Sequence, residues 1–260
     1  MSDLLAGKIA IVTGGGSGIG KAIGESLARN GARVAVASRD PSQLEAAAKS
    51  FERLERPLLA VQADIRKKEQ VRQAVEQVVA AWGRVDILVN NAGISGLTRI
   101  DDADDGRWID ILETNLTGTY LMTKAALKAM PDHSGGRIIN ISSVLGKFGV
   151  PGYSAYCASK HGMIGFTRAL ALEVVQRGIT VNAICPGWVE TEMARSGIEE
   201  SAAYQGLSPE EFKKQAVQAV PIRRFLEAEE VAHLVCYLAS PKAGGITGQA
   251  INICGGQTMV

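Results

Sequence analysis

Seven short apolar segments, rich in β-branched residues, alternate with longer amphipathic segments along the chain. The apolar segments are KIAIVTG (8–14), RVAVAS (33–38), LLAVQAD (58–64), VDILVNN (85–91), RIINISS (137–143), ITVNAICPG (179–187) and QAINICGG (249–256). Between them, stretches such as 18–30, 41–54 and 67–82 repeat apolar residues at helical spacing. Strands that alternate with helices are typical of a parallel sheet with helices on both faces. The pattern predicts a doubly wound α/β fold with seven parallel strands.

The domain organisation follows from the same pattern. No linker, repeat or low-complexity segment interrupts the 260 residues, so we expect residues 1–260 to form a single domain. Residues 188–226 are the exception, because they form a long polar and helical connection between the sixth strand and a helix near 227–239. Long connections in compact domains often cover binding sites. We expect a helical substrate lid here; a surface helical hairpin without a role in binding is the alternative.

Composition and charge exclude several classes of function. A net charge of +1 provides no long-range field for nucleic acid or an anionic membrane. No segment approaches the roughly 20 apolar residues of a membrane span, and the opening MSDLLAGKIA lacks the features of a signal peptide. The four cysteines and three histidines show no metal-binding or redox spacing. We therefore expect a cytoplasmic protein with reduced thiols and no metal site.

The glycine-rich segment TGGGSGIG (13–20) follows the first predicted strand and opens the first helix. A helix N-terminus presents free N–H groups and a partial positive charge, which stabilise a pyrophosphate. Glycine is needed where the backbone approaches phosphate oxygens and where the helix packs closely on the strand. The position therefore predicts a dinucleotide site of the Rossmann type, which includes Gly14, Gly16, Ser17, Gly18, Ile19 and Gly20.

The end of the second strand indicates which dinucleotide is bound. An NAD site usually has a carboxylate there for the ribose hydroxyl, but this strand ends in Ser38 and Arg39. Serine and a guanidinium suit a 2′-phosphate, so NADP(H) is favoured over NAD(H). Asp40 comes too late for the ribose role unless the loop is shifted. Asp64, followed by Ile65, ends the third strand and is expected at the adenine edge; a strand-end cap is the alternative for Asp64.

The segment YSAYCASKHG (153–162) contains two tyrosines and one lysine. Tyr156 and Lys160 are four residues apart and would be neighbours on a helix. Tyr153 is seven residues before Lys160, at or before the first turn, and is expected to line a pocket or pack. A tyrosine hydroxyl has an ordinary pKa of about 10. A nearby ammonium, together with the positive charge of an oxidised nicotinamide, is expected to lower it toward the range useful for proton transfer. Alone, the pair also fits an exposed surface pair.

Other polar residues gather at the carboxyl ends of predicted strands, where open α/β sheets bind their ligands. Ser142 and Ser143 end the fifth strand, and NNAG (90–93) ends the fourth. A hydroxyl there can hold a substrate oxygen as its charge develops. Asn115, in ETNLTG, falls inside a helix, an unusual place for asparagine unless it serves a polar site.

The chain resembles the short-chain dehydrogenase/reductase family over essentially its full length. The matching motifs are TGxxxGxG at 13–20, NNAG at 90–93, the asparagine of TNLTG, Ser143 thirteen residues before Tyr156, YCASK at 156–160 and PG at 186–187. The resemblance implies that Tyr156 is the proton donor or acceptor and that Lys160 holds the nicotinamide ribose and lowers the tyrosine pKa. It implies that Ser143 orients the substrate oxygen and that Asn115 anchors a water leading from Lys160 to solvent.

The same resemblance implies further cofactor contacts. Residues along the cofactor would be Asn90, Ala92, Gly93, Tyr156 and Lys160, and residues near the nicotinamide would be Pro186, Gly187, Val189 and Thr191. The implied reaction is hydride transfer between nicotinamide and a ketone or secondary alcohol. The family is commonly tetrameric, so a homotetramer that packs through helices near 105–130 and 152–176 is expected.

The substrate is less well defined. The chain is similar to both 3-oxoacyl carrier-protein reductases and aromatic polyketide ketoreductases, which implies a carbonyl reductase. The basic residues Lys128, Arg168, Arg195, Lys213 and Lys214 would suit an acyl thioester carried on phosphopantetheine, or they only solvate the surface. Leu172 stands where carrier-protein reductases often have a basic residue, which argues against a carrier protein. A dehydrogenase of free secondary or cyclic alcohols and a non-catalytic NADPH sensor are the alternatives.

Overall fold

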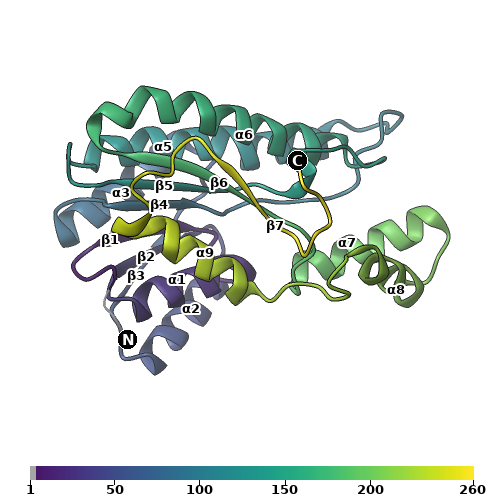
Figure 1. Cartoon of the computed structure of the whole chain (residues 1–260), viewed down its shortest axis with the longest axis horizontal. Helices are drawn as coiled ribbons and strands as arrows, with labels where there is room; N and C mark the ends of the chain where they lie inside the picture. Colours follow the sequence, from purple (N-terminus) through teal and green to yellow (C-terminus); the bar gives the residue numbers. More distant parts are fainter. Residues whose placement is uncertain (1–3) are drawn as a thin grey trace.

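The computed structural model describes residues 4–260, which contain one seven-stranded parallel sheet (Figure 1). The strands lie in the order β3-β2-β1-β4-β5-β6-β7, and every neighbouring pair is parallel. This confirms the predicted fold class. The strands are β1 (Ile9–Thr13), β2 (Arg33–Ser38), β3 (Leu58–Gln62), β4 (Ile87–Asn90), β5 (Arg137–Ile141), β6 (Thr180–Pro186) and β7 (Ala250–Ile253).

Helices cover both faces of the sheet (Figure 1). They are α1 (Gly18–Arg29), α2 (Pro41–Arg53), α3 (Lys68–Trp82), α4 (Gly106–Leu112), α5 (Gly118–Ala129), α6 (Ser154–Val174), α7 (Glu192–Gln205), α8 (Pro209–Ala219) and α9 (Ala228–Ala239). Successive residues of a strand point to opposite faces. In β1, Ala10 and Val12 join the core formed with α1, α2 and α9, whereas Ile9 and Ile11 join the core formed with α3, α5 and α6.

The strand order brings the functional loops together. The order reverses between β1 and β4, and ligands of open α/β sheets bind outside the carboxyl ends of the strands at such a point. The glycine-rich loop after β1 therefore lies beside the loop after β4. The hydroxyl of Thr13 joins the two loops, because it accepts hydrogen bonds from the N–H groups of Asn91 and Ala92, both at 3.0 Å.

The predicted long helix over 105–130 is interrupted. It begins as α4, passes through a π-helical turn at Glu113–Thr117 and continues as α5. Asn115 lies in that turn, where its amide donates to the carbonyl oxygen of Ile94 and its side-chain oxygen accepts from the Ile94 N–H. Sequence periodicity did not reveal this break, because the widened turn inserts into a pattern that remains helical on both sides.

The predicted lid segment contains α7 and α8, which extend from the sheet beyond its carboxyl edge (Figure 1).

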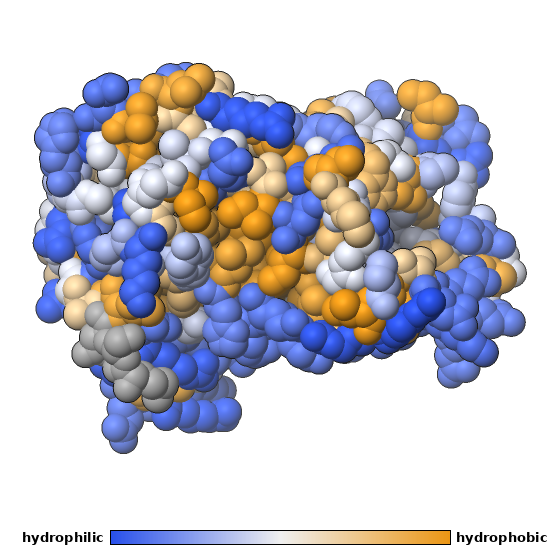
Figure 2. Space-filling model, in the orientation of Figure 1, coloured by the Kyte–Doolittle hydropathy of each residue, from blue (hydrophilic) through white to orange (hydrophobic). Residues whose placement is uncertain are grey.

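Strand β7 is the last strand of the sheet and forms one of its two edges. All four of its residues are only partly buried. Figure 2 shows apolar surface gathered over this part of the molecule.

Within residues 4–260, no helix has both the length and the apolar character needed to cross a bilayer.

One buried carboxylate holds the amino ends of β1 and β4. Asp86 is 1% exposed and accepts a 2.8 Å hydrogen bond from the Ile9 N–H. It also accepts from the guanidinium of Arg84 at 3.0 Å, and Lys8 lies 3.9 Å away. The two cations are partly exposed, whereas Ile9 is 2% exposed and its N–H loses this side-chain partner when the carboxylate is removed.

We therefore expect Asp86→Ala to lower the free energy of unfolding by about 3 kcal/mol, because it leaves a buried donor and two cations unpaired. Urea denaturation followed by circular dichroism measures this. Asp132→Ala is the control: it removes an exposed ion pair with Arg177 and should cost less than about 1 kcal/mol. Equal losses in the two variants would contradict a special role of Asp86.

Candidate active site

A cavity of about 520 Å³ opens at the carboxyl edge of the sheet. The loops that follow β1 to β6 line it, together with the start of α6 and one side of α7. The carboxyl ends of the parallel strands and the N-terminus of α1 both lie at this edge. The cavity therefore lies where the sequence predicts a dinucleotide and its substrate.

The phosphate end of the cavity is a glycine cradle. A Cβ on Gly20 would lie 2.2 Å from the carbonyl oxygen of Gly14, and one on Gly14 would lie 2.8 Å from Cα of Ala92. The amide of Asn91 closes the cradle by donating to the carbonyl oxygens of Thr13 and Gly14. Since α1 begins at Gly18, its free N–H groups face this cradle, which fits a pyrophosphate.

Most of the glycine-rich loop lines the cavity, but one predicted residue does not. Gly14, Ser17, Gly18, Ile19 and Gly20 are lining residues. Gly16 instead faces α2, where a Cβ would lie 2.4 Å from Cβ of Gln43. This glycine lets the loop pack on α2, and a contact of Gly16 with the cofactor stays a prediction.

Ser38 and Arg39 line the cavity at the end of β2, where we predict the cofactor ribose. The Ser38 hydroxyl donates to Gln43 at 3.0 Å and accepts from the Asp40 N–H. Asp40 caps α2 by accepting from the N–H of Ser42 at 2.9 Å, and the hydrogen bonds from Ser42 lower the pKa of this carboxyl. The carboxylate of Asp40 is thus engaged at the helix terminus. Within residues 4–260, the exposed guanidinium of Arg39 has no side-chain hydrogen bond or ion pair.

Asp64 and Ile65 line the adenine end. The Asp64 carboxylate accepts from the Arg66 guanidinium at 2.7 Å and from the Arg66 N–H at 3.0 Å. These contacts, led by the side-chain hydrogen bond, lower the pKa of Asp64. The strand-end cap is therefore what this side chain provides, while the residue still borders the cavity.

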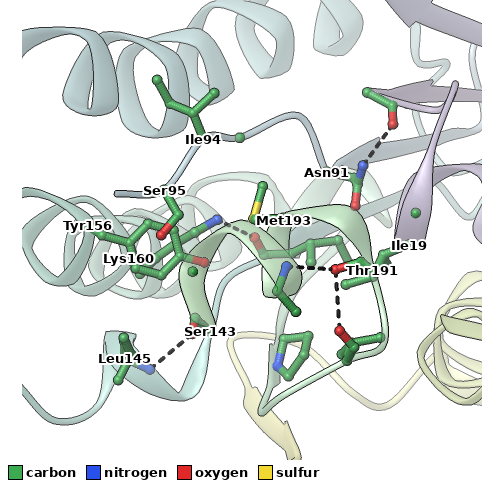
Figure 3. Close-up of a pocket in the computed structure, with 18 of the residues that line it drawn as sticks. Ile19, Asn91, Ile94, Ser95, Ser143, Leu145, Tyr156, Lys160, Thr191 and Met193 are labelled. Carbon is green, nitrogen blue, oxygen red and sulfur yellow. Dashed lines mark hydrogen bonds between the residues drawn. The ribbon is translucent and has the colours of Figure 1, made fainter. Parts of the chain in front are cut away.

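The chemical end brings together Ser143, Tyr156 and Lys160 (Figure 3). Tyr156 and Lys160 both lie on α6, and the Lys160 ammonium is 5.5 Å from the centroid of the Tyr156 ring. It donates a 2.8 Å hydrogen bond to the carbonyl oxygen of Ile141 at the end of β5. Ser143 follows β5, and its hydroxyl accepts from the Leu145 N–H. The predicted helical neighbours are therefore neighbours in the structure.

The protein's own groups do not lower the Tyr156 pKa as the spacing to Lys160 predicted. Burial dominates and raises the pKa of Tyr156 to about 12, while the Ser143 side chain acts in the opposite direction. Burial also lowers the pKa of Lys160 to about 8. Spacing identified the pair, but the sequence did not reveal that both groups are removed from water, which disfavours both charged forms.

Tyr153 precedes the first turn of α6, as predicted, and lines the same cavity. Its hydroxyl is 2.7 Å from that of Ser201 on α7 and 3.3 Å from the carbonyl oxygen of Gly197. Tyr153 is thus directed toward the lid, and Tyr156 is the tyrosine beside the lysine.

Asn115 and Asn90 do not line the cavity. Asn115 is fully buried and, besides holding Ile94, donates to the hydroxyl of Ser159 at 3.0 Å. Asn90 donates to Thr123 and to Asn140. The side chain of Asn90 thus belongs to a buried hydrogen-bond chain between β4, β5 and α5, and the placement of this residue along the cofactor stays a prediction.

The remaining predicted residues line the cavity: Ala92, Gly93, Pro186, Gly187, Val189 and Thr191. Thr191 also caps α7 by accepting from the Ala194 N–H at 3.2 Å. The prediction missed Asn91, which the NNAG motif contained, and an apolar wall made of Phe148, Val150, Trp188, Met193 and Phe212. Trp188, Met193 and Phe212 belong to the predicted lid segment 188–226, whereas no sequence signal marked Phe148 and Val150.

Among residues 4–260, no three histidine, cysteine or acidic side chains are grouped so that they could hold a metal ion. The candidate site therefore consists of a phosphate cradle, a basic ribose end and a tyrosine, lysine and serine at one cavity.

Comparisons with known proteins agree with this geometry. The family model described as short chain dehydrogenase matches residues 8–202. A Streptomyces coelicolor protein named "Putative ketoacyl reductase" is 43% identical over 251 residues, with 96% of each chain covered. The 3-oxoacyl-[acyl-carrier-protein] reductase FabG of Haemophilus influenzae is 39% identical over 252 residues, which cover 97% of this chain and 98% of that relative.

A solved structure is similar over almost the whole length. The crystal structure of a variant of actinorhodin polyketide ketoreductase with NADPH has a TM-score of 0.92 and 42% sequence identity, and 99% of each chain is covered.

Because the Lys160 ammonium is buried, the stability of the protein should depend on pH. Its pKa is about 8 in the native state against an ordinary value of 10.5, so the penalty for burying its charge is complete below about pH 8. The penalty disappears as the pH rises toward 10.5, where the unfolded chain also loses the proton. The stability of the wild type relative to Lys160→Met should therefore increase by about 3 kcal/mol between about pH 7 and pH 10.5.

Urea denaturation of both proteins across this pH range measures the difference. Lys128→Met, which alters an exposed lysine of α5, should show no such pH-dependent difference from the wild type. A constant difference for Lys160→Met would contradict the burial of a charged ammonium.

Proposed function

Because the chain belongs to the short-chain dehydrogenase family, we propose that it is an NADP(H)-dependent oxidoreductase that reduces a ketone of the 3-oxoacyl or polyketide type. The observation that carries the proposal is the convergence of Ser143, Tyr156 and Lys160 at one end of a cavity whose other end is a glycine cradle. Proton transfer and dinucleotide binding can thus take place in one enclosed space.

The proposed chemistry assigns one task to each side chain. The bound cofactor supplies the hydride chemistry. Tyr156, whose pKa is about 12, holds a proton that it donates to the substrate oxygen during reduction. The Ser143 hydroxyl orients that oxygen. The Lys160 ammonium, 5.5 Å from the tyrosine ring, stabilises the phenolate that remains and binds the cofactor ribose.

We also propose a path for water between Asn115 and Lys160. A Cβ on Gly93 would lie 3.1 Å from the side-chain oxygen of Asn115 and 3.6 Å from the Lys160 ammonium. The absence of a side chain at Gly93 therefore leaves a position that approaches both groups. A water held there by Asn115 would restore the proton of the lysine and tyrosine pair from solvent.

The preference for NADP(H) is supported by the ribose end. The Arg39 guanidinium is exposed beside the cavity, Ser38 is small, and the Asp40 carboxylate caps α2. A 2′-phosphate would therefore meet a cation and no free carboxylate from this loop. The actinorhodin ketoreductase structure, which is similar over 99% of the chain, contains NADPH.

The substrate class is supported by the named relatives and by the apolar wall of the cavity. An acyl thioester fits the relatives, and we propose it beside free ketones. Leu172 is 80% exposed on α6 and gives no charge for a carrier protein, which favours free or ring-containing ketones. The reverse oxidation of a free secondary or cyclic alcohol is the alternative activity.

A homotetramer is part of the proposal. Apolar or aromatic side chains of α4, α5 and α6 remain at least a third exposed: Trp108, Ile109, Tyr120 and Leu172. A second apolar surface lies over β7 (Figure 2). Apolar surfaces of this kind are typical of subunit interfaces.

The two tyrosines separate the proposed proton donor from its neighbour. Tyr156→Phe should lower kcat about a thousand-fold, because the proton donor is lost, while the Kd for NADPH changes less than about three-fold. Tyr153→Phe should keep kcat within about ten-fold of the wild type. Steady-state assays at 340 nm with acyl thioesters, ketones and alcohols, together with fluorescence titration of NADPH, measure both. Equal losses in the two variants, or cofactor binding without turnover of any substrate, would contradict the proposal.

Cofactor preference depends on Arg39. Arg39→Asp should shift the ratio of kcat/KM for NADPH to that for NADH at least about 30-fold toward NADH, because it replaces attraction of the 2′-phosphate with repulsion. Arg33→Asp is the control, since Arg33 is exposed at the opposite end of β2. An unchanged ratio for Arg39→Asp would show that the 2′-phosphate binds elsewhere.

A further inference from the structure

We propose that the hydroxyl groups of Tyr153 and Ser201 form a second polar subsite, which binds a substrate oxygen other than the one that is reduced. This inference rests on the proposed reductase function and narrows its substrate class. It concerns a pair of side chains that no step of the proposed proton transfer uses.

The pair is buried and lies in the cavity of the candidate site. Tyr153 is 8% exposed and Ser201 is 6% exposed, and both are lining residues together with Tyr156. Their hydroxyl oxygens are 2.7 Å apart, although 48 residues separate them in the chain. The contact joins the start of α6 to the lid helix α7.

The hydrogen-bonding capacity of the pair is not exhausted. Each hydroxyl has one proton and two acceptor positions. In one arrangement, Ser201 donates to Tyr153, and Tyr153 donates to the Gly197 carbonyl oxygen at 3.3 Å. In the other, Tyr153 donates to Ser201, whose own proton then has no acceptor in the described part of the chain. A substrate oxygen can take that proton while the contact between the two hydroxyls is kept.

The surroundings make such a donor selective. Much of the substrate end of the cavity is apolar: Ile94, Val150, Pro151, Trp188, Met193 and Phe212. A substrate carbonyl that enters an apolar wall loses its hydrogen bonds to water and is disfavoured unless a donor replaces them. The Tyr153 and Ser201 pair offers that replacement at one place on the wall.

The lid helix is fixed so that Ser201 stays beside Tyr153. Gly197, Glu200, Ser201 and Tyr204 follow each other at helical spacing on one side of α7. The Glu200 carboxylate accepts from the Leu97 N–H at 3.1 Å and forms an ion pair with Arg107. Glu200 is therefore a positioning residue for the neighbouring hydroxyl.

Gly96 makes this ion pair possible. A Cβ on Gly96 would overlap the Arg107 guanidinium. The loop after β4 can therefore hold the guanidinium against its backbone, where Glu200 meets it.

The ligand class follows from this arrangement. The subsite fits a ketone that carries a second oxygen, such as an ester, thioester or ring carbonyl, with Tyr156 at the reacting carbonyl. A ketone with one oxygen would meet only Tyr156 and Ser143. The test therefore compares ethyl acetoacetate with the methyl ketone of equal chain length, and cyclohexanedione with cyclohexanone.

In this test, Tyr153→Phe and Ser201→Ala should each lower kcat/KM for the substrates with two oxygens about 10-fold, mainly through KM. They should change kcat/KM for the matched monoketones less than about two-fold. The double variant should lose little more than either single variant, because the hydroxyls act as a unit. Glu200→Gln should give a smaller loss with the same selectivity. Tyr237→Phe and Ser196→Ala, at exposed positions, serve as controls.

Substrate binding is measured separately from turnover, because a failure of the proposed subsite can then be distinguished from a failure of the proposed reductase activity. Trp188 lines the cavity, and quenching of tryptophan fluorescence by ethyl acetoacetate gives a Kd without catalysis. A Kd weakened about 10-fold in Tyr153→Phe and Ser201→Ala supports the subsite, even if the wild type reduces no ketone and the proposed function fails. An unchanged Kd, or equal losses for substrates with one and two oxygens, would overturn the subsite.

Discussion

The buried side chain of Lys160 ties the chemical end of the site to the sheet. Its ammonium is held by the carbonyl oxygen of Ile141 at 2.8 Å, and its own main-chain carbonyl oxygen accepts from the hydroxyl of Ser142 at 3.1 Å. Both partners belong to the end of β5 and the residue after it. The position of α6 along β5 is thus fixed at this residue, and Tyr156 lies one turn earlier on the same helix. A charged lysine is costly to bury, so a fold that keeps it there has a use for the charge.

The sheet carries this arrangement to the phosphate end. Because all strands run in the same direction, their carboxyl ends share one edge, and the loops after β1 and β4 meet where the strand order reverses. The Thr13 hydroxyl and the Asn91 amide then cross-link these loops by four hydrogen bonds. The glycine cradle and the lysine are therefore parts of one edge, which in the proposed function would hold both ends of a long cofactor in a fixed relation.

Local patterns predicted much of this arrangement. Composition predicted the strands, the order of strand, glycine turn and helix predicted the glycine cradle, and a four-residue spacing joined Tyr156 to Lys160. What failed depends on tertiary contacts. Asn90 and Asn91 are adjacent in the sequence, but the first side chain is buried between β4, β5 and α5 and the second reaches the glycine loop. A motif does not state which of two adjacent side chains faces the cavity. The expected lowering of the Tyr156 pKa by Lys160 also failed, because the spacing of these two residues does not say whether their side chains are buried.

The lid was predicted from the length and polarity of one connection and not from a motif. The segment 188–226 was expected to cover the site, and its two helices are bound to the body in different ways. Three residues of α7 are buried and its middle is held by the Glu200 contacts, whereas α8 buries none of its residues. Helix α8 packs on α7, and beyond that helix Phe212 lies edge-on against Trp188 while Lys213 pairs with Glu190 and lies over the Phe225 ring.

An element with few buried contacts separates at a lower free energy than one with many. We therefore expect α7 to act as a wall of the cavity and α8 as its movable cover. Trp188 is stacked on the buried ring of Phe225, with centroids 5.3 Å apart, and so remains with the body when α8 moves. The aromatic surface on which α8 rests is thereby also part of the cavity wall.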